Sequence, residues 1–156
     1  MGTPWEGSES VTDSAHLASS LFHFVENGVA NIDDPPLSVV KEAIRALDGD
    51  EINTVSIGLR NGDSMEIGGG KQGRYVCYTR IKKSHPCYLY HLVNPDCPRD
   101  MKDLVHINMG DGESWTYPRC TIVSLETVLI AAECFCISGE MSPSLAWDNK
   151  LNFEIA

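Results

Sequence analysis

The sequence predicts an α+β fold in which an antiparallel sheet of five or six strands is packed by helices and followed by a C-terminal helix. Three observations predict this class. Apolar residues recur at helical spacing in the first third of the chain and again over 124–139. Between these regions apolar and polar residues alternate, as in half-buried strands. Asn61-Gly62 joins two alternating runs, which is typical of a β-hairpin and therefore of antiparallel strands.

The chain has 156 residues, enough for one domain with a sizeable core. Residues 1–13 are polar and are expected to form a flexible lead, so a single domain is expected to span 14–156. Residues 1–13 have neither the basic segment nor the following apolar segment of a secretory signal peptide. No stretch of the sequence approaches the roughly 18 consecutive apolar residues of a membrane-spanning helix. We therefore expect a cytoplasmic protein without a membrane partner.

Two helices are expected before the strands. Residues 13–28 place leucine and aromatic residues at helical spacing, although Phe22-His23-Phe24 also fits a strand. The next helix is expected to follow Asp34 as its cap, with Pro35 in the first helical position, and to end at Asp48-Gly49. Its apolar stripe consists of Val40, Ala43, Ile44 and Leu47.

Six alternating runs follow and are expected to form the sheet. A Gly68-Gly69-Gly70 loop separates the second run from the third, and Pro118 is expected to break the last run. The runs lie at 52–60, 64–69, 74–81, 86–93, 104–109 and 115–123.

The closing helix has clear boundaries in the sequence. Ser124 can cap its start, and Glu126 in the first turn suits the helix dipole. Gly139 ends the helix before Pro143. Beyond it, Trp147 is expected to tuck against the sheet. The buried stripe is expected to contain Leu125, Val128, Leu129, Ala132, Phe135 and Cys136.

No motif in the sequence predicts catalysis. Residues 68–74, GGGKQGR, lack the G-x-x-x-x-G-K-[ST] pattern of a phosphate-binding loop. Residues 110–114, GDGES, match neither a serine-nucleophile nor a calcium-loop pattern. The five histidines fall in no metalloprotease or deaminase arrangement. We therefore expect no catalytic residue, no cofactor and no bound metal.

The six cysteines contain no C-x-x-C pair, and without a secretory signal free buried thiols are expected. One alternative stays open. His85, Cys87 and His91 would share one face of a strand and lie near Cys97 in the sequence, a set that could bind zinc. Because the spacing matches no zinc finger, ordinary sheet residues are favoured over a zinc site.

The chain carries a formal net charge of −10, with the acid excess at its two ends. An acid excess repels phosphate backbones, so direct binding to nucleic acid is not expected. The acids either keep the protein soluble or form a face for a basic partner. The middle of the chain is net basic and contains Lys71, Arg74, Arg80, Lys82 and Lys83.

A proline-containing strand, a capped helix, a closing glycine and a later tryptophan follow one another in the last third of the chain. The residues are Pro118, Val123, Ser124, Glu126, Ala131, Ala132, Phe135, Gly139 and Trp147. This ending resembles bacterial immunity proteins of the first large immunity family in polymorphic toxin systems. Residues 54–78 resemble the central hairpin of the family, so the resemblance covers about 50–150. One departure is Ser142, where members often have proline; here Pro143 comes next.

The resemblance implies a non-catalytic inhibitor that binds its cognate toxin in the cytoplasm. Known partners of the family include nucleic-acid deaminase toxins, delivered by contact-dependent or specialised secretion. The net charge of −10 suits this role, because a toxin that handles nucleic acid presents a basic groove. We expect the inhibitor to occlude the active site of the toxin sterically.

The candidate toxin-binding residues are acids and one aromatic residue expected on hairpin tips: Asp63, Glu66, Asp111, Glu113 and Trp115. The alternative is that Trp115 belongs to the core and the acids are turn residues. Two other classes of function stay open, an acidic protein-interaction adaptor and a small zinc or thiol enzyme.

Overall fold

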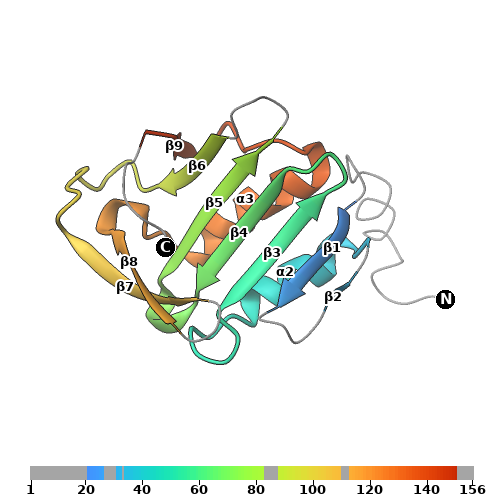
Figure 1. Ribbon diagram of the computed structural model, residues 1–156, viewed down its shortest axis with the longest axis horizontal. Coiled ribbons are helices and arrows are strands. Elements are labelled where there is room, and N and C mark those ends of the chain that lie inside the picture. The colour runs from blue at the N-terminus through green and yellow to red at the C-terminus, as the bar shows by residue number, and fades with distance from the viewer. Residues whose placement is uncertain (1–20, 27–30, 33, 83–87, 110–112, 151–156) are drawn as a thin grey trace.

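A computed structural model describes residues 21–26, 31–32, 34–82, 88–109 and 113–150. Within these ranges, two helices cover one face of a seven-stranded antiparallel sheet, and a separate two-stranded hairpin lies beside the sheet (Figure 1). This architecture confirms the predicted α+β class. Neither helix is long and apolar enough to cross a membrane.

The sheet has the strand order β2-β1-β3-β4-β5-β6-β9. Its strands are β1 (Leu21–Glu26), β2 (Asn31–Ile32), β3 (Thr54–Leu59), β4 (Ser64–Gly69), β5 (Tyr75–Ile81), β6 (Tyr88–Val93) and β9 (Ala146–Asp148). The hairpin consists of β7 (Leu104–Met109) and β8 (Glu113–Pro118). The helices are α2 (Leu37–Arg45) and α3 (Leu125–Ser138), and short 3-10 turns span Lys71–Gly73 and Arg119–Thr121.

The helix predicted over 13–28 is wrong where the structure describes this region. Leu21–Glu26 forms β1, which pairs antiparallel with both β2 and β3. A strand between two partners gains backbone hydrogen bonds that local helical spacing cannot reveal, so tertiary pairing overrides the local pattern. The rest of that segment lies outside the described residues, as does the predicted flexible lead over 1–13.

Helix α2 confirms the second predicted helix, but its start differs. The N-cap is Pro36 rather than Asp34, and no side chain caps the helix. The cause is the second proline: a residue that precedes proline is disfavoured in the helical region, so Pro35 cannot be the first helical residue. The helix therefore begins at Leu37. Its buried residues are Leu37, Val40, Ala43 and Ile44.

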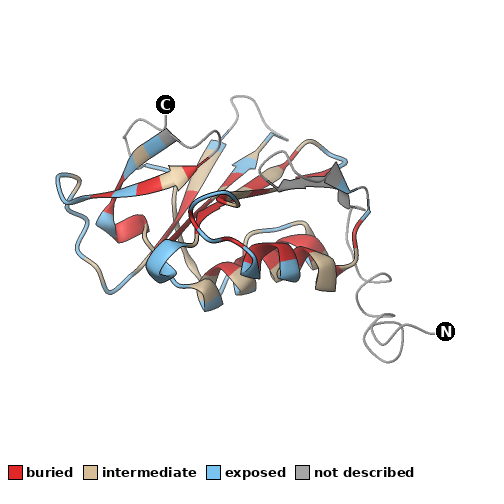
Figure 2. Ribbon diagram, turned by 90° about the horizontal axis from the view of Figure 1, so that it is seen from below, coloured by how far each residue is buried: buried red, intermediate tan, exposed pale blue. Residues whose placement is uncertain are grey.

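Helix α3 has the predicted boundaries. The Ser124 side chain accepts a hydrogen bond from the Thr127 N–H, and Gly139 adopts the left-handed conformation, with φ +76°, that ends the helix. Figure 2 shows both helices on the same side of the sheet, with their buried residues toward it. Lys41 of α2 and Glu133 of α3 form an ion pair at 2.5 Å. The buried residues of α3 are Val128, Ala131, Ala132, Phe135 and Cys136.

The predicted strands are confirmed as β3 to β8, with changes at their ends. The expectation that all six belong to one sheet is wrong, because only β3 to β6 join the main sheet, whereas β7 and β8 pair with each other in a separate hairpin. The last one ends at Pro118 because the chain turns there into a 3-10 turn. Strand β9 was not predicted; it pairs with β6 and carries Trp147. Trp147 packs against the main core and donates its Nε1–H to the Ser142 carbonyl at 3.0 Å, which confirms the expectation that it tucks against the sheet.

Candidate functional site

The face of the sheet away from α2 and α3, called here the open face, carries a row of polar side chains. Alternate residues of β3, β4, β5 and β6 belong to the main core beneath the helices, so the residues between them point to the open face. Strand register aligns these residues directly across five strands. The row consists of Ser56, Glu66, Tyr78, His91 and Asp148.

The β7–β8 hairpin lies against part of the open face. Its inward residues form a second apolar cluster with Val76 of β5, and Tyr78 and Trp115 pack at its edge. The approach depends on Gly68, where an added Cβ would lie 2.5 Å from the Met109 Cε. The hairpin therefore borders the polar row. The buried members of this cluster are Val76, Val105, Ile107, Met109 and Tyr117.

Burial governs the electrostatics of the polar row. It raises the pKa of Glu66, although the Ser56 hydroxyl donates a hydrogen bond to the Glu66 carboxylate at 2.5 Å and Arg80 supplies positive charge nearby. Burial, together with the charge of Glu66, raises the pKa of Tyr78 to about 12. The same face thus holds a partly desolvated carboxylate beside a neutral phenol.

The other end of the row is also partly desolvated. Burial lowers the pKa of His91 to about 4, and the charge of Asp148 opposes this shift. Asp148 forms an ion pair with Arg99. The rings of Tyr78 and His91 lie 5.6 Å apart. Shifted pKa values mark functional sites but also occur in structural polar networks. Here each shift follows from burial within a row of cross-strand neighbours.

Burial disfavours thiolate formation at two of the described cysteines, Cys77 and Cys136. Cys77 lies in the main core, and burial raises the pKa of its thiol. Burial also raises the pKa of Cys136 to about 12, which disfavours the nucleophilic thiolate. In the part of the chain that is described, no three or more His, Cys, Asp or Glu residues gather as a metal site. His85 and Cys87 lie outside the described residues, so the zinc alternative stays untested.

The predicted binding residue Asp63 lies in the β3–β4 turn and is fully buried. Its carboxylate accepts the Lys82 N–H at 2.8 Å, and its own N–H donates to the Asn61 side chain at 2.9 Å. It precedes β4, whereas Met109 packs at Gly68 near the other end of that strand. The structure therefore does not bring Asp63 together with the hairpin.

Two other predicted residues, Glu66 and Trp115, lie on or beside the open face. Glu66 is on the open face, and its charge contributes to the raised pKa of the buried Tyr117 on β8. Trp115 pairs with Ile107 and is half-buried in the second cluster. Glu113 begins β8 opposite Met109, and nothing is described of its side chain. Asp111 lies outside the described residues.

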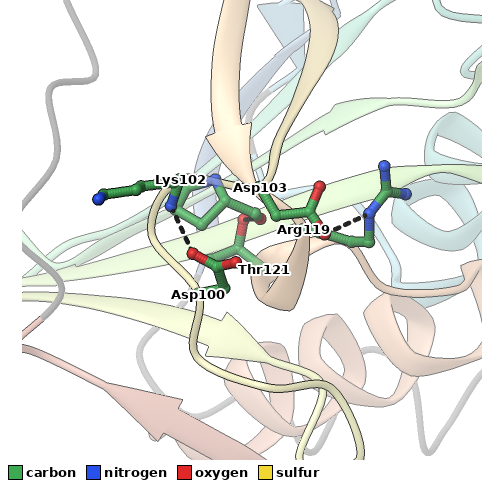
Figure 3. A network of polar contacts seen from close by, with 6 residues as sticks. Asp100, Lys102, Asp103, Arg119 and Thr121 are labelled. Carbon is green, nitrogen blue, oxygen red and sulfur yellow. Dashed lines mark hydrogen bonds and ion pairs between the residues drawn. The ribbon is translucent and has the colours of Figure 1, made fainter.

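An acidic connection between β6 and β7 was missed in the sequence because it falls in the net basic region. Asp96, Asp100 and Asp103 are all exposed there. Figure 3 shows the Arg119 Nε donating to the Asp103 carboxylate, at 3.0 Å, and the Lys102 N–H donating to Asp100, at 2.9 Å. The spacing of aspartates in NPDCPRDMKD was the available signal.

Comparison with known families gives one match. The family model described as Immunity protein Imm1 matches residues 38–149, which is more than half of the chain. The matched range includes most of α2, all of α3, strands β3 to β9, the polar row and the hairpin. A search of curated proteins found no match.

Proposed function

The chain belongs to the Imm1 family of immunity proteins, and we propose on that basis that it binds and inhibits a cognate protein toxin in the cytoplasm. The family match carries this proposal. It agrees with the earlier resemblance, which rested on the strand, helix, glycine and tryptophan of the last third of the chain. The protein acts as a binding inhibitor and needs no catalytic residue of its own.

The proposed target is a toxin that acts on nucleic acid, with a deaminase as the favoured class. Such a toxin needs a basic groove to hold its substrate. A chain with a net charge of −10 is attracted to that groove and approaches it quickly. Once docked, the inhibitor blocks substrate entry by its bulk. Asp96 and Asp100, which are exposed in the β6–β7 connection, supply part of this acidic surface, whereas Asp103 is paired with Arg119.

We place the toxin-binding face on the β7–β8 hairpin and the adjoining open face. Glu66 and Trp115 border the second cluster, and Glu113 begins the second strand of the hairpin. Asp111 stays part of the proposal through its position in the sequence between β7 and β8. Asp63 supports the structure instead of contacting the toxin. Its buried carboxylate accepts the Lys82 N–H and so connects the β3–β4 turn to the chain just after β5.

The test is co-expression of this chain with the toxin domain encoded next to it. We expect cell survival and a complex that co-purifies at low salt and weakens as salt rises, because acidic and basic surfaces attract each other less when screened. Loss of rescue together with absence of a complex would contradict the proposal.

Variants then locate the binding face. Glu113→Gln and Trp115→Ala are expected to weaken the complex, whereas Glu126→Gln, which removes an exposed acid at the start of α3, serves as the matched control. Trp115 also packs in the second cluster. The affinity of Trp115→Ala is therefore compared with that of the native chain only if thermal unfolding shows that the variant is folded. Equal weakening by Glu126→Gln would place the face elsewhere.

A further inference from the structure

A small pocket lies where three segments meet: the α2–β3 loop, the β4–β5 connection and strand β7. Its volume is about 190 Å³. The pocket brings two cationic side chains and an imidazole to one place on a strongly acidic protein. The residues that define it are Gly49, Gly69, Lys71, Arg74, His106 and Asn108.

Close backbone contacts hold the walls of this pocket together. An added Cβ at Gly49 would lie 2.5 Å from the Lys71 Cβ, and one at Gly70 would lie 2.5 Å from the Leu47 carbonyl oxygen. Both glycines have positive φ, +75° and +113°, so glycine is needed for conformation as well as for space. Asn108 donates a side-chain hydrogen bond to the Gly49 carbonyl at 3.0 Å, which attaches β7 to the same loop.

The cations of the pocket are available to an external anion. Within the described part of the chain, neither Lys71 nor Arg74 forms an ion pair, whereas Lys41, Arg99 and Arg119 do. The neighbouring Asp48 carboxylate accepts N–H groups of its own loop, at 2.8 and 3.1 Å. The Nδ1 atom of His106 lies 3.4 Å from the Ser114 hydroxyl.

We infer that this pocket binds a single carboxylate side chain, Asp or Glu, of the toxin. The inference rests on the proposed function and adds a specificity site to it. The pocket is smaller than the roughly 300–1,000 Å³ typical of small-molecule sites, so it suits one side chain of a protein partner. Arg74 and Lys71 can donate charge-assisted hydrogen bonds to the two carboxylate oxygens.

A basic pocket can provide the partner specificity that net charge alone does not provide. An acidic surface attracts any basic protein, so bulk charge raises the association rate without choosing a partner. An Asp or Glu side chain of the toxin can pair with Lys71 and Arg74 only when the two proteins dock in one relative orientation. Non-cognate toxins without that acid leave the cations of the pocket unpaired in the interface, which disfavours their complexes.

The decisive experiment measures the affinity of the complex for the double variant Lys71→Gln/Arg74→Gln. Bulk attraction alone predicts equal or tighter binding, because the variant is more acidic than the native chain. The pocket predicts the opposite: a loss of roughly 10- to 100-fold, mostly through faster dissociation. The matched control Arg45→Gln/Arg60→Gln removes two other exposed cations and is expected to leave dissociation unchanged.

Two outcomes overturn different statements. If the native chain binds the toxin and the double variant binds as tightly or more tightly, the pocket inference fails while the proposed function stands. If the native chain binds no toxin, both fail. A measurement on the free protein adds an independent check: titration with sodium acetate, against sodium chloride at equal ionic strength. Saturable changes in the amide NMR signals of 71–74 and 106 are expected, and their absence would also overturn the pocket.

Discussion

The two faces of the sheet differ in how they are stabilised. The face beneath α2 and α3 is closed by one large apolar cluster that contains most of the buried residues of the described chain. The open face carries the polar row and a smaller cluster beneath the β7–β8 hairpin. Apolar burial is the main stabilising term of folding, so the helix-covered face specifies the fold. Polar groups that are costly to bury gather on the other face, where binding is proposed.

The largest expected contrast compares the same substitution in the two clusters. Ile57 is fully buried in the main cluster, and Ile107 is 5% exposed in the second one. We expect Ile57→Ala to lower the free energy of unfolding by about 4 kcal/mol and Ile107→Ala by about 2 kcal/mol, because the smaller cluster leaves a site that can relax or hydrate. Urea unfolding measures both values. An equal or reversed order would contradict the division into a main and a secondary core.

A second prediction concerns pH and the polar row. The folded chain holds His91 neutral, with its pKa lowered to about 4, whereas the unfolded chain has the usual value near 6.5. Between these values the unfolded state binds more protons, so stability is lost as pH falls from about 6.5 to about 4. The loss attributable to His91 is about 3 kcal/mol at most.

The measurement is urea unfolding across that pH range for the native chain and for His91→Gln, with His106→Gln as the exposed control. The readout is the slope of stability against pH, which does not depend on a lower overall stability of the variant. Glu66 has a raised pKa and therefore the opposite dependence, so the comparison is repeated in a Glu66→Gln background. Equal slopes for His91→Gln and the native chain would contradict the prediction.

The smallest effect tests how the hairpin rests on the open face. Gly68→Ala places a Cβ against the Met109 side chain, and we expect it to lower the free energy of unfolding by about 1–2 kcal/mol. Because the Met109 side chain is flexible, part of the strain is relieved by its movement. In a Met109→Ala background, Gly68→Ala should lower the free energy of unfolding by a smaller amount. A double-mutant cycle measures this coupling, and strict additivity of the two substitutions would show that the contact does not matter.

Much of the fold could be predicted because its signals are local. Ser124 and Gly139 bound α3, and Asn61-Gly62 marks the β3–β4 turn. Strand β1 was given only as the alternative to a helix at Phe22-His23-Phe24, because its partner β3 lies about thirty residues away in the sequence. Strand β9 was missed because it is only three residues long. The prolines before α2 were interpreted correctly as a start signal, but the predicted start lies two positions too early.

The candidate site was harder to predict because it depends on register. Glu66, Tyr78 and His91 come from three different strands and become neighbours only after pairing is fixed. The pocket at Lys71 and Arg74 similarly requires two loops and β7 to meet. The acid excess and the family ending pointed to an inhibitor, whereas the proposed position of its binding surface depends on the assembled sheet.

The central claim is that the hairpin-bearing side of the molecule contacts the toxin and the helix-covered side does not. Backbone hydrogen exchange of this chain, alone and in complex with the toxin domain encoded next to it, tests that claim most directly. The account predicts slower exchange in β7, β8 and the β4–β5 connection, with α2 and α3 unchanged. Slower exchange confined to α2 and α3 would contradict it.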